Sequence, residues 1–177
     1  MKKFTLAAYD AMPVMDGWRE CPPGDYTAIS AFGAWSIFGA RSSFGEGAIF
    51  GARSNFGDRS SFGAWSNFGD RSSFGAASSF GAGAIFGEGC KIDGTERVLL
   101  SSTVYSAGGF GSANRTTYGF AVADGVWVRC GCWAGMLDDF RARVREVHGG
   151  TPIEREYLLV ADLFEARRAR EEKGGGE

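Results

Sequence analysis

The sequence predicts a mainly β fold in which one short strand-and-corner unit is stacked many times, followed by a small α+β domain that ends in two helices. Ten Phe-Gly pairs recur every six residues between Phe32 and Phe86 without a gap. From Arg97 onward this period is lost, and patterns typical of longer strands and then of helices replace it. A fixed short period indicates one repeating structural unit, and 177 residues suffice for one or two small domains.

Each repeat has the form F-G-x-x-S-x, and twelve units run from Tyr26 to Ile92. Six residues do not suit a helix, whose 3.6-residue period would rotate successive phenylalanines around its surface. They suit a strand with a corner, because side chains two apart in a strand point to the same side. Each Phe therefore shares the inner face with the small residue two positions before it. These small residues are Ser36, Ser42, Ala48, Ser54, Ser60, Ser66, Ser72, Ser78, Ala84 and Cys90.

The pattern resembles the left-handed parallel β-helix of hexapeptide-repeat proteins, whose unit is an aliphatic residue, Gly, two variable residues, a small residue and one more. This resemblance implies three units per triangular coil and about four coils. The chain departs from it in using Phe where the family uses Ile, Leu or Val, and the small residue beside each ring is expected to compensate. The implied inward columns are Tyr26, Phe44, Phe62 and Phe80; Phe32, Phe50, Phe68 and Phe86; and Phe38, Phe56, Phe74 and Ile92.

Residues 1–25 contain several prolines and predict an irregular cap, because an open coil would expose unpaired strand edges. Beyond the repeats, 97–105 is expected to be a strand, and Asp124-Gly125 between two β-rich runs predicts a hairpin. Helical spacing predicts a helix over 136–148, and the capping box that begins at Thr151 predicts a second one. The expected domains are a cap (1–25), a Phe-Gly solenoid (26–96), an α+β domain (97–171) and a disordered tail (172–177).

The C-terminal part also resembles uncharacterised proteins of phages and prophages that carry similar Phe-Gly hexads. The resemblance lies in segments such as VYSAGGFGSANRTTYGF and VRCGCWAGMLDDFRARVREVHG, within about residues 100–165. It implies a phage or prophage setting. It brings no known chemistry, so it assigns no role to any residue.

Charge and hydropathy argue against several classes of partner. The net charge is −2, so the chain lacks the basic surplus that nucleic-acid binding requires. No apolar run approaches the ~18 residues of a membrane span, and the N-terminal apolar stretch is too short for a typical signal peptide. We therefore expect no nucleic-acid partner, no membrane association and a location in the cytoplasm of a bacterial host.

Four cysteines, Cys21, Cys90, Cys130 and Cys132, leave two interpretations open. Cys130 and Cys132 would share one face of a strand and could bind zinc with the other two, although their spacing differs from that of usual zinc-binding pairs. Reduced, buried cysteines are the preferred interpretation. We expect no metal and no cofactor.

An enzyme is the alternative that the first resemblance raises, since many hexapeptide-repeat proteins are acyltransferases with a catalytic histidine near a coil junction. The only histidine here, His148, lies outside the repeats at the expected end of a helix, where a cation complements the helix dipole. No repeat is interrupted by an inserted loop. We expect no catalytic residue, with a hexapeptide-repeat acyltransferase kept as an alternative.

The corners between strands carry the side chains that we interpret as a partner-binding site, because exposed Trp and Arg dominate the energetics of protein interfaces. A competing interpretation is a solvated edge that neutralises itself, since Asp58 precedes Arg59 and Asp70 precedes Arg71. The candidate residues are Trp35, Arg53 and Arg71 in one column, Arg41 and Arg59 in a second, and Trp65 in a third.

One flat side of the solenoid is expected to carry Ile49, Asn67 and Ile85 on its outer surface. Flat, partly apolar surfaces often mark association, so we expect a homo-oligomer formed through these residues.

Together these features predict a non-enzymatic, phage-type protein that binds a host protein or protein complex through a rigid solenoid. An inhibitor of a bacterial defence system, comparable to anti-CRISPR proteins, is the more specific hypothesis. A virion structural component is a further alternative. A disordered Phe-Gly protein, as in nuclear pores, is disfavoured by the unbroken period and the small residue in every repeat.

Overall fold

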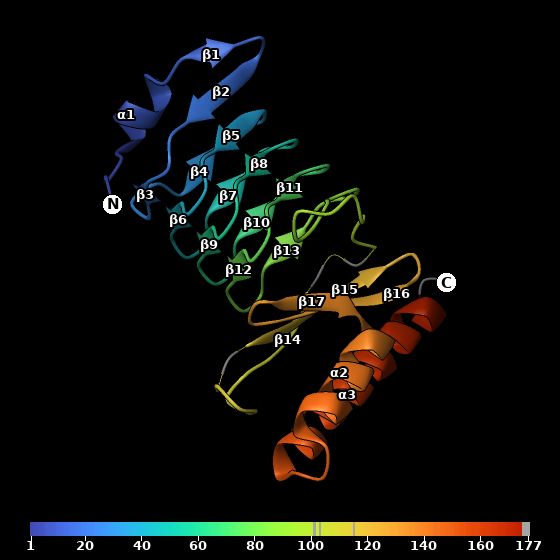
Figure 1. Cartoon of the computed structure of the whole chain (residues 1–177). Coiled ribbons are helices and arrows are strands. Elements are labelled where there is room, and N and C mark those ends of the chain that lie inside the picture. The colour runs from blue at the N-terminus through green and yellow to red at the C-terminus, as the bar shows by residue number, and fades with distance from the viewer. Residues whose placement is uncertain (101, 103, 115, 175–177) are drawn as a thin grey trace. The chain divides into compact units, whose positions relative to one another are not determined.

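A computed structural model describes residues 1–100, 102, 104–114 and 116–174 of the chain (Figure 1). The chain forms two compact units, Met1–Thr103 and Val104–Glu177, and each is described here by itself. Four coils of a β-solenoid fill most of the first unit, and the second holds an antiparallel sheet with two helices. The predicted fold class is therefore confirmed.

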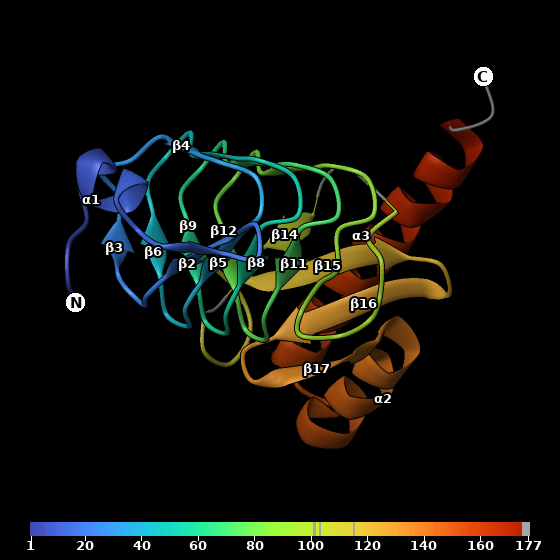
Figure 2. The same ribbon diagram turned by 90° about the horizontal axis from the view of Figure 1, so that it is seen from above.

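The solenoid has three parallel sheets, each built from every third strand of the chain (Figures 1 and 2). Their parallel strands are ordered β3-β6-β9-β12, β4-β7-β10-β13 and β2-β5-β8-β11, and β1 (Val14–Met15) extends the last sheet by pairing antiparallel with β2. In every parallel pair of repeat strands, Phe or Tyr lies opposite the Phe eighteen residues away, for example Phe50 beside Phe68. The strands are β3 (Asp25–Tyr26), β4 (Ala31–Phe32), β5 (Ser36–Phe38), β6 (Ser43–Phe44), β7 (Ile49–Phe50), β8 (Asn55–Phe56), β9 (Ser61–Phe62), β10 (Asn67–Phe68), β11 (Ser73–Phe74), β12 (Ser79–Phe80) and β13 (Ile85–Phe86).

The rings of the repeat fill the core as three ladders, which confirms the inward columns. Along a ladder, ring centroids are 4.8–5.5 Å apart and the rings are close to parallel. Between ladders the rings meet edge to face, at 75–90°. The spacing along a ladder is set by the strand separation of about 4.8 Å. Both arrangements are favourable for aromatic pairs, so each ring makes favourable contacts within its own ladder and with the two neighbouring ladders.

The small residue of each repeat is buried beside the rings and also closes the corner. In Ser54, Ser60 and Ser66 the hydroxyl donates to the carbonyl of the Gly three residues earlier, at 2.7–2.8 Å. A buried hydroxyl needs such a partner, and this one comes from within the same unit. A larger side chain would compete with the rings for the narrow interior.

From Phe38 onward, the Gly after each Phe is required by the close approach of neighbouring segments, whereas Gly33 has room for a Cβ. A Cβ at Gly69 would lie 2.4 Å from the backbone nitrogen of Ala52. Because the clash is with backbone, no side-chain movement could relieve it.

The N-terminal segment is more regular than the irregular cap that we expected. It contains α1 (Leu6–Asp10), β1 (Val14–Met15) and β2 (Trp18–Cys21), and β2 pairs in parallel with β5. Phe4 stacks on Tyr26 at 4.7 Å, which adds one ring to the first ladder.

The first repeat departs from the pattern. Ile29 is buried and Ser30 exposed, where the later repeats bury the residue equivalent to Ser30.

The strand expected over 97–105 includes residues 101 and 103, which lie outside the described residues. In the described part of this stretch only Tyr105 belongs to a strand, β14 (Tyr105–Ala107). Val98 forms an isolated bridge with Lys91, and the N–H of Leu99 donates to the carbonyl of Cys90 at 2.8 Å. This stretch therefore covers part of the last coil, in the same unit as the solenoid.

The second unit has a four-stranded antiparallel sheet in the order β14-β15-β16-β17. Strands β15 (Thr117–Val122) and β16 (Gly125–Cys130) confirm the predicted hairpin. Strand β17 (Trp133–Met136) was not predicted, because Gly131-Cys132 did not stand out as a turn. The hydrophobic core of the second unit contains Val128, Phe140, Val144, Tyr157 and Phe164.

The two C-terminal helices are α2 (Leu137–His148) and α3 (Pro152–Gly174). At the start of α3 the N–H of Glu154 donates to the hydroxyl of Thr151 at 3.3 Å, as the capping box predicts. The positive φ that ends the loop lies at Gly150, whereas Gly149 has a φ of −50°. Helix α3 continues through Gly174 where a disordered tail was expected, and 175–177 lie outside the described residues. Among the described residues no helix is long and apolar enough to cross a membrane.

The ring ladders predict a strong, local sensitivity to loss of one ring. Phe62→Ala should lower the free energy of unfolding by about 3–5 kcal/mol, because it leaves a cavity between two stacked rings. Ser61→Ala, on the outer side of the same strand, should change it by about 0.5 kcal/mol or less. Urea denaturation of both variants measures the difference, and equal effects would show that the rings do not hold the coil together.

Candidate protein-binding surface

Most corners of the solenoid place their second residue in the left-handed region of the backbone map. The φ of Arg53 is 59° and that of Trp65 is also 59°. A positive φ at the second of two turn residues is the mark of a type II turn, where Gly or Asn is the usual choice. The non-glycine residues at these corners are Trp35, Arg41, Arg53, Arg59, Trp65, Arg71 and Ala77.

This conformation costs about 1–2 kcal/mol for residues other than Gly. Hydrogen bonds between coils hold it at the six Trp and Arg corners, because each of these N–H groups donates to a carbonyl of the next coil; the bond from Arg53 to Asp70 is 2.8 Å long. The N–H of Ala77 donates instead to a carboxylate oxygen of Asp93. Gly47, Gly83 and Gly89 occupy equivalent corners, so the coil itself does not require a large side chain there. Bulky side chains at strained corners indicate a role outside the coil.

The Trp35 edge, which consists of Trp35, Arg53 and Arg71, is an ordered row of side chains. The guanidinium of Arg53 lies over the indole of Trp35 at 4.4 Å. The ring of Trp18 meets the same Trp35 indole edge to face, with 4.9 Å between ring centroids. Trp35 keeps 38% of its surface exposed. Trp18 was missed from the sequence, because the N-terminal segment showed no repeat register.

The acidic residues of the corners do not neutralise the arginines by direct contact. A carboxylate oxygen of Asp58 accepts a hydrogen bond from the backbone N–H of Ala76 at 2.8 Å, and one of Asp70 accepts from Glu88 at 2.9 Å. Within the part of the chain that the structure describes, none of the four corner arginines forms an ion pair. The guanidinium groups of Arg41, Arg59 and Arg71 therefore have no carboxylate partner among the described residues, while that of Arg53 lies over Trp35.

Trp65 lies on a different edge, between Gly47 and Gly83. Its indole covers Gly83, where an added Cβ would lie 2.3 Å from the ring. Even so, 65% of Trp65 is exposed. We call this row the Trp65 edge.

These two edges border one flat side of the solenoid. Strands β4, β7, β10 and β13 follow the corners of the Trp65 edge and precede those of the Trp35 edge. Their outward residues form the isoleucine face, with Ile49 56% and Ile85 47% exposed. The face consists of Ala31, Ile49, Asn67 and Ile85.

The structure thus joins the proposed self-association residues and four of the partner-binding residues into one surface. Arg41 and Arg59 are not part of it. They lie on the third edge, which separates the other two sheets.

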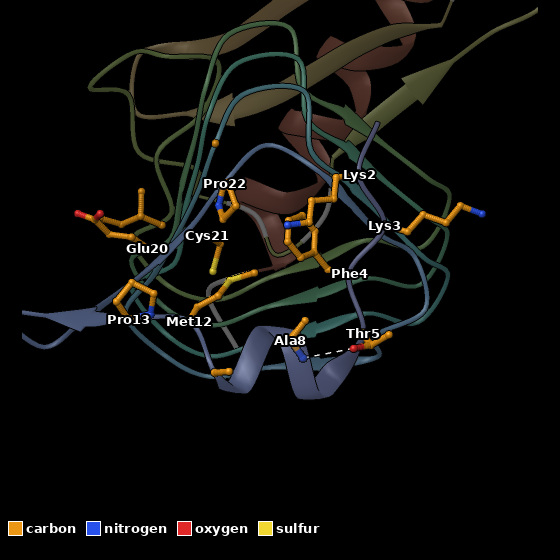
Figure 3. A pocket seen from close by; sticks show the side chains of 13 residues that line it. Lys2, Lys3, Phe4, Thr5, Ala8, Met12, Pro13, Glu20, Cys21 and Pro22 are labelled. Carbon is orange, nitrogen blue, oxygen red and sulfur yellow. Dashed lines mark hydrogen bonds between the residues drawn. The ribbon is translucent and has the colours of Figure 1, made fainter.

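A pocket of about 690 Å³ opens at the N-terminal end of the first unit, between α1 and β2 (Figure 3). Phe4, Met12 and Cys21 line it, with Lys2 and Lys3 on one side. None of the predicted site residues lies in this pocket.

The cysteines occupy unlike environments. Cys21 and Cys90 are buried near opposite ends of the solenoid, whereas Cys130 and Cys132 belong to the second unit. Burial raises the pKa of the Cys21 thiol to about 12 and that of Cys90 to about 11. Among the described residues no group of three or more His, Cys, Asp or Glu side chains could hold a metal ion.

Comparison of the chain with protein families, curated proteins and solved structures finds no match in any of the three. Its function is therefore inferred from its own residues and geometry.

The backbone strain predicts that a corner arginine can be removed without harm to the fold. Arg59→Gly should leave the free energy of unfolding unchanged or raise it by up to about 1 kcal/mol, since relief of the strained φ offsets the greater freedom of Gly in the unfolded chain. The control is Ser60→Gly at the neighbouring buried position, which should destabilise. A loss above about 1 kcal/mol in Arg59→Gly would mean that the arginine supports the coil.

Thiol reactivity should separate the cysteines in the folded protein. Iodoacetamide at neutral pH should alkylate exposed Cys132 first and leave Cys21 and Cys90 unmodified, because their raised pKa values leave almost no thiolate. Peptide mass spectrometry reads each site, and protein unfolded in urea should react at all four. Alkylation of Cys21 as fast as Cys132 would show that the first coil opens readily.

Proposed function

We propose that this chain is a non-enzymatic protein that binds another protein through the isoleucine face and its two flanking edges. The observation that carries the proposal is the placement of Trp35, Arg53, Trp65 and Arg71 at strained corners around exposed isoleucines. Trp and Arg are the side chains most often found at interface hot spots. Free guanidinium groups beside apolar surface suit a protein surface that carries carboxylates around an apolar centre.

The size of the surface bears on the kind of complex. Four coils at about 4.8 Å give a face on the order of 20 Å tall. Even a face equally wide would cover only about 400 Å², less than the roughly 800 Å² that each partner of a standard interface buries. The edges must therefore contribute as well as the face. A partner with a groove or two lobes would reach both edges together.

The setting of a phage or prophage, and the action on a bacterial defence complex in the host cytoplasm, are the finer part of this proposal. Both rest on the resemblance of the C-terminal segments and on the small, rigid design of the chain. The left-handed winding of the coils stays a prediction from the hexapeptide pattern. The acyltransferase and virion alternatives have no observation of this structure in their favour.

Loss of the Trp35 edge should abolish partner binding without loss of stability. The full chain, immobilised and exposed to lysate of a bacterial host, should retain a protein that mass spectrometry identifies, and calorimetry with that purified protein then measures affinity. Trp35→Ala with Arg71→Ala should weaken binding by at least about 100-fold, as expected for two hot-spot residues. The melting temperature should stay within a few degrees, since both side chains lie outside the core.

Arg41→Ala with Arg59→Ala is the matched control, because it removes two corner arginines from the third edge. Equal loss of affinity in both double variants would point to net charge rather than to this surface. Unchanged affinity after loss of the Trp35 edge would refute the proposed site.

In the absence of the partner protein, the isoleucine face should mediate self-association. Ile49→Asp with Ile85→Asp places two carboxylates on the face and should convert an oligomer to monomer in light scattering coupled to gel filtration. Ser61→Asp with Ser79→Asp, on the outer surface of another sheet, is the control and should leave the oligomer intact. A monomer in the unmodified protein would contradict self-association and leave the face open for the other partner.

A further inference from the structure

A second candidate site lies entirely within the second unit. A pocket of about 340 Å³ opens between the β16–β17 turn, the C-terminal half of α2 and the start of α3. Its volume falls within the range of small-molecule sites. It shares no residue with the solenoid surface, so the two can be tested separately.

The walls of this pocket are a continuous series of aromatic rings. Trp133 lies 5.6 Å from Phe140, Phe140 lies 5.9 Å from Tyr157, and Tyr157 lies 5.6 Å from His148, all between ring centroids. Phe140, Tyr157 and Val144 belong to the buried core of the unit. The pocket floor is therefore held rigidly, and its shape does not depend on the rim.

The lining also includes polar side chains. They are Arg143, His148, Ser112, Tyr157, Cys130 and Cys132. The thiol of Cys130 accepts a hydrogen bond from the hydroxyl of Thr117 at 3.3 Å, which fixes it in place. Among the residues that the structure describes, no Asp or Glu lines the pocket.

Arg143 is the rim group that can recognise a charge. Its guanidinium pairs with Glu146 at 2.8 Å, but both side chains are more than half exposed. An exposed pair of this kind contributes about 0–1 kcal/mol, so a ligand carboxylate can take over the guanidinium at little cost. Arg binds carboxylates through two parallel hydrogen bonds, which fixes orientation as well as charge.

We propose that this pocket binds a small aromatic carboxylate, with its ring against Trp133, Phe140 and Tyr157 and its carboxylate on Arg143. Aromatic walls favour a flat ring over an aliphatic chain, because stacked and edge-to-face contacts add to the burial of apolar surface. Among the described residues that line the pocket, Arg143 is a cation and none is an acid, because its partner Glu146 lies outside the lining. The lining therefore favours an anion over an ammonium ion. The imidazole ring of His148, which lies beside Tyr157 in the pocket wall, then contributes to binding and not to catalysis.

The test compares 1-naphthylacetate with its uncharged amide, 1-naphthylacetamide, on the ¹⁵N-labelled full chain. 1-Naphthylacetate should cause saturable shifts in the indole N–H signal of Trp133, which is assigned by its loss in Trp133→Phe. 1-Naphthylacetamide should bind at least about fivefold more weakly, because it cannot form an ion pair with the guanidinium of Arg143. Bound 1-naphthylacetate should also slow the alkylation of Cys132, which gives an independent measure of binding.

Two rim variants keep the result interpretable. Arg143→Gln should lower the affinity for 1-naphthylacetate at least about fivefold and leave the affinity for 1-naphthylacetamide unchanged. Arg145→Gln, on the same helix outside the pocket, should change neither affinity. Val147→Trp, at an exposed rim position, should weaken both probes by filling the opening. The proposal fails if neither probe shifts the Trp133 signal, or if acetate and amide bind equally and Arg143→Gln has no effect.

Discussion

The structure of the first unit depends on one packing constraint: three large side chains, all aromatic except Ile92 in the last coil, must fill each turn of a narrow coil. Stacked rings at 4.8–5.5 Å match the separation of neighbouring strands, so every ring gains contacts above, below and beside it. The other positions of the repeat follow from this. A small residue leaves room for the rings, its hydroxyl binds the turn, and the Gly after Phe lets the next coil approach.

Because the core is fixed by two positions of the repeat, the corners and the outward strand positions are free to vary. The chain places glycine or alanine at some corners and Trp or Arg at others, although glycine suits that backbone conformation best. The coil itself therefore does not require the large side chains at these corners, which is why we propose that they serve binding. Asp58 and Asp70 serve the coil instead, since their carboxylates accept backbone N–H groups of the next turn.

Much of this architecture could be predicted from the sequence, because the period, the ring columns and the buried small residues are properties of single positions. The hairpin at Asp124-Gly125 and the capping box at Thr151 were likewise local signals. What could not be predicted depends on contacts between distant segments: Trp18 against Trp35, and the pocket that His148 shares with Cys132. The strained corner φ values were also missed, since Arg and Trp are unusual choices for that conformation.

Amide hydrogen exchange at the corners tests most directly whether the ring ladders hold them rigid. The N–H groups of Arg53 and Arg71 donate to carbonyls of the next coil at 2.8 and 2.7 Å, so they should exchange only when the solenoid unfolds as a whole. Their protection should equal that of Phe56 and Phe68 in the strands. Exchange at the rate of open loops would contradict a rigid display of Trp and Arg, and with it the binding surface built on that rigidity.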